Sequence, residues 1–137
     1  MPNWVDNEVY ITHANRDAFD WLADIVENGD NGIFQGIVPI ENVDEVSSSF
    51  RVELWGTRSD VFQESSPDWD GSECSLRQAD IERECKFMHL RFETAWEPPR
   101  GIFQALVSKG FDLSCQYRDP NMFMGYWDNG DDRVIAF

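Results

Sequence analysis

The feature that most constrains this chain is a strict alternation of apolar and polar side chains over Lys86 to Thr94. Met88, Leu90 and Phe92 fall on one face of an extended strand, and charged or aromatic residues fall on the other. This period of two residues is typical of a strand with one buried face. The same alternation predicts three further strands, at residues 8–13, 50–55 and 111–118.

Two other segments have the pattern of amphipathic helices. Residues 16–28 carry an apolar stripe behind Asn15, a favourable N-cap residue. Pro98-Pro99 mark the beginning and Gly110 the end of a second helix. We expect Trp96 to pack beneath the two prolines and form a rigid corner with them. Less regular patterns predict a short helix at 75–84, edge strands at 122–127 and 133–137, and a strand-like or irregular stretch at 33–40.

Read in order, these elements predict an α+β fold. The succession β-α-β-β-α-β is that of a ferredoxin-like sandwich, an antiparallel sheet with two helices on one face. The acidic and polar residues 57–84 are expected to form a long insertion between the central strands. A length of 137 residues fits a single domain over residues 1–137.

The net charge of the chain limits the kinds of molecule that it can bind. The chain has 26 acidic and 11 basic residues, which gives a net charge of −15. Such a chain is repelled by nucleic acids and by anionic membranes, so direct nucleic-acid binding is disfavoured and a basic partner is favoured. The sequence contains no apolar run of membrane-spanning length and no leader pattern, from which we expect a cytoplasmic protein without a membrane partner.

The residue patterns do not point to catalysis or to metal binding. The chain lacks the common nucleophile, phosphate-binding and zinc-protease motifs. Cys85 and His89 come closest to a metal pair, but on a strand they would lie about 13 Å apart, too far for one ion. We therefore expect a non-enzymatic protein with reduced cysteines, no metal and no cofactor. The three cysteines are Cys74, Cys85 and Cys115.

The first candidate site is a row of acids on the helix predicted at 16–28. The acids recur at intervals of three, four and three residues, which places them on one helical face opposite the apolar stripe. Their spacing of about 5 Å along the axis approaches that of successive backbone phosphates. The alternative is an ordinary solvated face. The row consists of Asp17, Asp20, Asp24 and Glu27, and further acids follow at Asp30, Glu41, Asp44 and Glu45.

The second candidate site is the sheet face that the two helices leave open. Aromatic and basic residues interleave on this face, as on the sheets of RNA-recognition modules that stack bases. The alternative is that another segment covers the face and that its arginines form cross-strand ion pairs. The residues concerned are Tyr10, Arg51, Trp55, His89, Arg91 and Arg118.

Several short motifs occur in an order that resembles the YubB-like family of plasmid and phage proteins. They are Met1-Pro2-Asn3-Trp4, Phe34-x-x-Ile37-x-Pro39-Ile40, Trp55-Gly56-Thr57, Phe92-Glu93-Thr94-Ala95-Trp96-Glu97-Pro98-Pro99 and Gly125-Tyr126-Trp127. The motif at residues 92–99 and Trp55-Gly56-Thr57 are the most specific. Together, all five motifs span most of the chain. The resemblance implies a ferredoxin-like domain encoded by a mobile element, and it implies no particular activity.

Together, these patterns predict an acidic binding protein of a plasmid or phage. We expect its carboxylates to imitate a nucleic-acid backbone and to inhibit a basic host protein, either a DNA-binding protein or a defence protein of the restriction or CRISPR type. The alternative is a module that binds a ligand or single-stranded nucleic acid on the open sheet face.

Overall fold

The computed structural model describes residues 4–28, 32–40, 48–57, 60–62, 74–119 and 123–136. The described helices are α1 (Arg16–Asn28), α2 (Ile33–Ile37), α3 (Ser48–Trp55) and α4 (Arg100–Ser108). The described strands are β1 (Trp4–Thr12), β2 (Val61–Phe62), β3 (Cys74–Glu82), β4 (Phe87–Ala95), β5 (Asp112–Asp119), β6 (Phe123–Asp128) and β7 (Asp131–Ala136).

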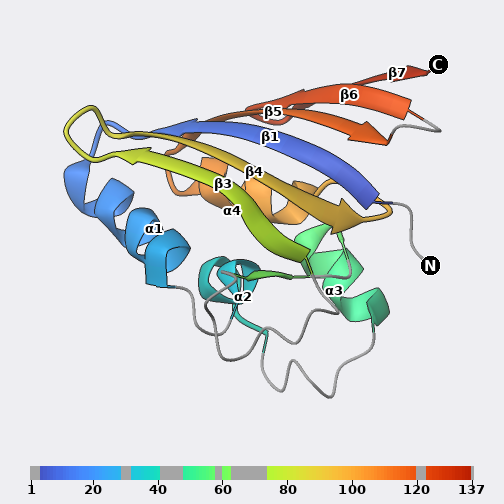
Figure 1. Cartoon of the computed structure of the whole chain (residues 1–137), viewed down its shortest axis with the longest axis horizontal. Helices are drawn as coiled ribbons and strands as arrows, with labels where there is room; N and C mark the ends of the chain where they lie inside the picture. Colours follow the sequence, from blue (N-terminus) through green and yellow to red (C-terminus); the bar gives the residue numbers. More distant parts are fainter. Residues whose placement is uncertain are drawn as a thin grey trace.

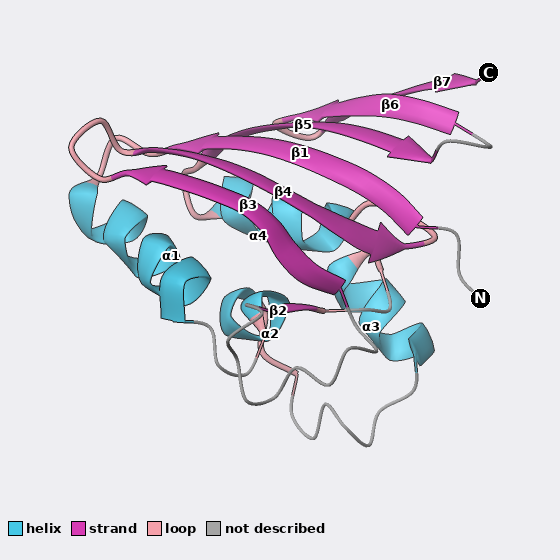
Figure 2. Cartoon of the chain, in the orientation of Figure 1, coloured by secondary structure: helices cyan, strands magenta, loops and turns pink. Residues whose placement is uncertain are grey.

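The fold is α+β, built on one sheet of order β2-β3-β4-β1-β5-β6-β7. Six strands, β1 and β3 to β7, pair antiparallel with their neighbours, and the short β2 joins β3 in parallel. The helices lie on one side of the sheet, as Figures 1 and 2 show. The described elements leave the opposite side uncovered, and this side is called the open face below.

Three of the predicted strands and both main helices are confirmed. The strands predicted at 8–13, 86–94 and 111–118 are β1, β4 and β5, and β1 lies between the other two. Asn15 caps α1, because its Oδ1 accepts the N–H of Ala18 at 2.9 Å. α4 begins directly after Pro99, and Gly110 has the positive φ of 93° that favours glycine behind a helix.

The strand predicted at 50–55 is wrong, because these residues belong to helix α3. An alternation over six residues is too short to exclude a helix. The tertiary contacts of Trp55 favour the helix over the strand. The Trp55 side chain is fully buried, and its indole N–H donates to the Val38 carbonyl at 2.9 Å. Val52 and Leu54, the apolar positions of the predicted strand, are 40% and 37% exposed.

The helix predicted at 75–84 is also wrong, because residues 74–82 form strand β3 and pair with β4. The second strand of the predicted order is therefore β3. The proposed insertion 57–84 contains β2 and β3, and its residues 58–59 and 63–73 lie outside the described part of the chain. The irregular stretch 33–40 contains helix α2, while the two predicted edge strands are confirmed as the hairpin β6–β7.

Helix α2 is only five residues long and depends on a distant cap. The buried Asp60 carboxylate accepts the N–H groups of Phe34 at 2.7 Å and of Gln35 at 3.1 Å. A carboxylate at this end of a helix satisfies free N–H groups and is favoured by the helix dipole. Gly32 has a φ of 102°, and a Cβ there would lie 2.1 Å from Asp60 Oδ2. The packing therefore requires glycine at this position.

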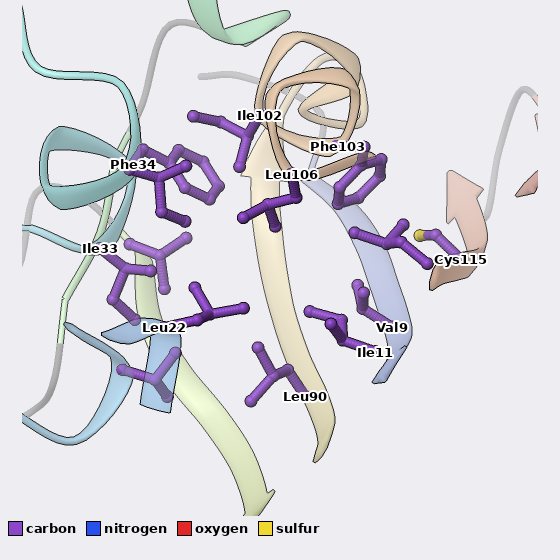
Figure 3. Close-up of a cluster of buried hydrophobic side chains, with 14 of the residues drawn as sticks. Val9, Ile11, Leu22, Ile33, Phe34, Leu90, Ile102, Phe103, Leu106 and Cys115 are labelled. Atoms are coloured by element: carbon purple, nitrogen blue, oxygen red, sulfur yellow. The ribbon is translucent and has the colours of Figure 1, made fainter. Parts of the chain in front are cut away.

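The core fills the space between the sheet and the helices (Figure 3). Val9 and Ile11 of β1 and Leu90 of β4 point into it, and they meet side chains from all four helices. Phe92 is 4% exposed and Leu106 is 2% exposed, which confirms both as core residues. An apolar gap of about 20 Å³ lies inside this cluster, between side chains of the sheet and of α1, α2 and α4.

The corner between β4 and α4 joins the two most specific sequence motifs. Thr57 Oγ1 donates to the Ala95 carbonyl at 2.9 Å, and Gly56, with a φ of 87°, lies against the backbone of Pro98. The two prolines are buried. Trp96 has a φ of 70° and is 43% exposed, so it is not fully buried at this corner, and its packing beneath the prolines stays a prediction.

Candidate interaction surfaces

The predicted acidic row lies along α1, opposite the buried side chains of that helix. Arg83, in the turn between β3 and β4, bridges three members of the row. Its Nη1 lies 3.1 Å from Asp20, and its Nη2 lies 3.0 Å from both Asp24 and Glu27. The hydrogen bonds to Asp24 and then to Glu27 raise the pKa of Arg83. The three carboxylates therefore converge on one guanidinium.

The turn that carries Arg83 is held against the same helix by a second arginine. Arg16 Nη1 donates to the Arg83 carbonyl at 2.7 Å, and its Nη2 donates to the Glu84 carbonyl at 3.3 Å. Asp17 is exposed and makes no ion pair within the described residues. The remaining predicted acids, Asp30, Glu41, Asp44 and Glu45, lie outside the described residues.

The open face carries four of the six residues predicted for the second site. Tyr10, His89, Arg91 and Arg118 lie on β1, β4 and β5, and their strands alternate so that these side chains point away from the helices. The assignment of Arg51 and Trp55 to this face is wrong. Both belong to α3 on the helical side, where the Arg51 guanidinium lies 5.6 Å from the centre of the Trp55 ring.

At the centre of the open face, Glu8, Tyr10 and His89 form a hydrogen-bonded cluster. The Tyr10 and His89 rings stack at a centroid distance of 4.6 Å. Glu8 Oε1 accepts the Tyr10 hydroxyl at 2.7 Å and lies 3.0 Å from His89 Nε2. The hydrogen bond from Tyr10 is the main cause that lowers the pKa of Glu8, and the same bond raises the pKa of Tyr10.

The basic residues of the open face are mostly engaged in ion pairs. Arg91 forms two hydrogen bonds to the Asp6 carboxylate, at 3.2 and 2.8 Å, and Arg77 pairs with Glu93. The alternative of cross-strand ion pairing is thus confirmed for Arg91, although its partner is Asp6. Arg118 is exposed and makes no ion pair within the described residues. The face therefore offers few unpaired positive charges to a phosphate backbone.

A shallow hollow of about 160 Å³ opens beside Tyr10. Its lining includes two carboxylates and three hydroxyls, so its rim is acidic. The lining residues are Tyr10, Thr12, Asp112, Leu113, Ser114, Asp128 and Asn129.

The sequence patterns missed a second polar cluster, on the helical side. Arg100 Nε donates to Asp132 at 2.7 Å, and the buried Tyr117 hydroxyl donates to the same carboxylate. The Arg100 guanidinium also lies 5.3 Å from the centre of the Tyr117 ring. Gly125 makes room for the phenol, since a Cβ there would lie 2.4 Å from the Tyr117 hydroxyl. The cluster joins α4, β5 and β7.

Tyr117 gives the chain a specific response to alkaline pH. Burial, followed by the hydrogen bond to Asp132, raises the pKa of Tyr117 to about 12 from an ordinary value of 10.0. The folded chain therefore keeps a proton that the unfolded chain loses, and stability should decrease as the pH rises from 10 to 12. We expect urea unfolding to show this decrease in the wild type and a smaller one in Tyr117→Phe. Equal pH dependence in the two proteins would contradict the assignment.

Among the described residues, no cluster of three or more His, Cys, Asp or Glu side chains is arranged to hold a metal ion. Cys85 is exposed in the β3–β4 turn and Cys115 is buried, and both are free thiols. None of the described helices combines the length and the apolar character needed to cross a membrane. Comparisons of the chain with protein-family models, curated proteins and solved structures find no match. The resemblance to the YubB-like family therefore stays a prediction.

Proposed function

We propose that this chain is a non-enzymatic acidic binding protein of a mobile element, which docks on the basic surface of a nucleic-acid-binding host protein. The observation that carries the proposal is the convergence of Asp20, Asp24 and Glu27 on the Arg83 guanidinium at 3.0–3.1 Å. Basic grooves that bind DNA present guanidinium groups of the same kind. A helix face that holds one arginine in its own chain has the geometry to engage an arginine of a partner.

The overall charge supports the same function. A net charge of −15 steers the chain toward basic surfaces and repels nucleic acid. Exposed ion pairs such as those of Arg83 contribute little stability, typically less than about 1 kcal/mol each. A partner arginine therefore displaces Arg83 at low cost. In this view the acids replace phosphates, and the host protein, whether a DNA-binding or a defence protein, loses access to its own nucleic acid.

We also propose that β1, α1, β3, β4, α4 and β5 form a ferredoxin-like unit, to which β6 and β7 are added at one edge. The strand order β3-β4-β1-β5 with antiparallel neighbours, and one long helix after each of β1 and β4, supports this interpretation. A ferredoxin-like unit agrees with the fold that the YubB-like resemblance implies. The same resemblance implies the mobile-element setting.

A second function is favoured by the exposed aromatic side chains of the open face. Tyr10, stacked on His89, is 41% exposed, and Tyr126 is 42% exposed. Such rings can stack on bases or on a flat ligand. The ion pairing of Arg91 and the acidic rim of the nearby hollow count against a polyanion, so we rank this function second.

The amide variant of the acidic row tests the first proposal. Changing Asp17, Asp20, Asp24 and Glu27 to their amides should slow association with an oligo-arginine peptide, and raised salt should slow the wild type toward the same rate. The wild type should also displace labelled duplex DNA from basic host DNA-binding proteins, and the amide variant should do so at higher concentration only. Stopped-flow association rates and DNA displacement measure these effects.

Arg83→Gln is the matched control. It frees the same carboxylates without changing any of them, so it should accelerate association with the peptide. An amide variant that associates as fast as the wild type with the same salt dependence would show that the row is an ordinary solvated face. Binding of single-stranded nucleic acid by the chain alone, lost in Tyr10→Ala, would instead support the second function.

A further inference from the structure

We propose that β7 is a self-association edge, through which two copies of this chain join their sheets antiparallel about Val134. Figure 1 shows β7 at one edge of the sheet, and the described residues provide it with no outer partner. Val134 is 57% exposed and Ile135 is 49% exposed, the two highest values for large apolar side chains among the described residues. A free strand with such side chains is a template for another strand.

The two edges of the sheet differ in how they are protected. At the other edge, β2 pairs with the beginning of β3, and an irregularity between Leu76 and Gln78 interrupts the strand. Charged side chains continue along β3 beyond that point. Short partners, bulges and charges are devices that prevent edge pairing. From Arg133 to Ala136, β7 has no bulge and no short outer partner among the described residues. Its one charged side chain in this stretch is that of Arg133.

The hairpin turn determines which backbone groups of β7 are free. Asn129 and Gly130 both have positive φ, 46° and 102°, as a two-residue hairpin turn of the favoured type requires. The Asn129 N–H donates to Leu113 on β5, so the backbone groups of Asp128 point the other way, toward Asp131. Hydrogen bonding then alternates along the strand. The outward N–H and C=O groups are those of Asp132, Val134 and Ala136.

Among symmetric registers, only the one centred on Val134 pairs the outward backbone groups of all three residues. In an antiparallel pair of identical strands, one residue faces itself across the two-fold axis. Centring on Arg133 would oppose two guanidinium groups, and the backbone of Arg133 already faces β6. Centring on Val134 pairs Val134 with itself, Arg133 with Ile135 of the second copy and Asp132 with Ala136 of the second copy. Each Val134 then exchanges both backbone hydrogen bonds with the other.

Local charge favours a second copy over a basic strand. Asp132 is bound by Arg100 at 2.7 Å and Asp131 by Arg133 at 2.9 Å, so the acids of β7 are neutralised within their own chain. A basic strand would gain little here, and an identical strand meets no unpaired acid. The repulsion between two chains of net charge −15 acts over a longer range and is screened by salt. Added salt should therefore strengthen this association, whereas it weakens docking on a basic partner.

Sedimentation of the purified chain across protein and salt concentrations tests the proposal. We expect a reversible dimer that increases with salt, and Val134→Lys should raise its dissociation constant by about tenfold or more. Val52→Lys is the matched control, because Val52 is also exposed, at 40%, but lies on α3. A chain that stays monomeric at every concentration and salt, or an equal loss in both variants, would overturn the proposal.

A cysteine variant tests the register even if Val134→Lys folds poorly. Opposed residues of a hydrogen-bonded antiparallel pair have Cα atoms about 5.5 Å apart, within the disulfide range. With Cys74 and Cys85 changed to serine, Val134→Cys should therefore form a covalent dimer on mild oxidation, and Arg133→Cys should not. Equal cross-linking of the two variants, or none in either, would contradict the Val134-centred pair.

Discussion

Replacing Phe92 by alanine is expected to lower the free energy of unfolding by about 3–5 kcal/mol, and replacing Leu106 by about 2–5 kcal/mol. Phe92 is 4% exposed and meets the Phe34 ring edge to face at 5.7 Å, while Leu106 closes the core from α4. Both truncations should leave a cavity that the surrounding side chains fill only in part. Urea unfolding measures the loss.

Tyr126→Ala is the control for these core variants. Tyr126 is 42% exposed on the open face, so the same kind of truncation removes little buried surface. We expect a change of less than about 1 kcal/mol. Core variants that unfold at the same urea concentration as Tyr126→Ala would contradict the packing of α4 and β4.

Gly101→Ala is expected to destabilise the chain by about 3 kcal/mol or more, because the clash it creates is between backbones. A Cβ at this position would lie 2.1 Å from the Leu54 carbonyl oxygen, where α3 crosses α4. Inside a helix, alanine is otherwise preferred over glycine by about 1 kcal/mol. A large loss of stability from this substitution can therefore be attributed to the close α3–α4 crossing alone. Thermal or urea unfolding gives the value.

Gly36→Ala provides the comparison within another helix. A Cβ on Gly36 would lie 2.8 Å from the Ile25 side chain, which can move, whereas the Leu54 backbone cannot. We expect Gly36→Ala to cost much less than Gly101→Ala. Equal losses in the two variants would mean that the α3–α4 crossing is looser than described.

The sequence predicted the elements whose own period was decisive. β4 and α1 are long enough to repeat their patterns several times. Local chemistry fixes two helix ends, because Asn15 caps the beginning of α1 and Gly110 follows the end of α4. Residues 50–55 are too few for their period to distinguish a strand from a helix. Their alternation suits a strand, but burial of Trp55 against Val38 forms a helix instead. In β3, pairing with β4 outweighs a weak helical pattern.

The candidate surfaces were predictable as residue sets but not as contacts. The spacing of Asp20, Asp24 and Glu27 placed them on one face, and only the tertiary structure brings Arg83 to them from 56 or more positions away. The nearest sequence signal was a lone arginine among acids at residues 80–84. The Tyr117 cluster gave no signal, since its partners come from three separate elements.

The central position of β1 has a consequence for how the chain acquires its structure. β1 pairs on one side with residues 87–95 and on the other with residues 112–118, so both of its neighbours are far away along the chain. A growing chain on the ribosome therefore carries this apolar strand unpaired until most of the sequence has been made. Closing such long loops is slow, which places the chain among slow-folding topologies. Until those partners are made, residues 4–12 are open to misplaced pairing.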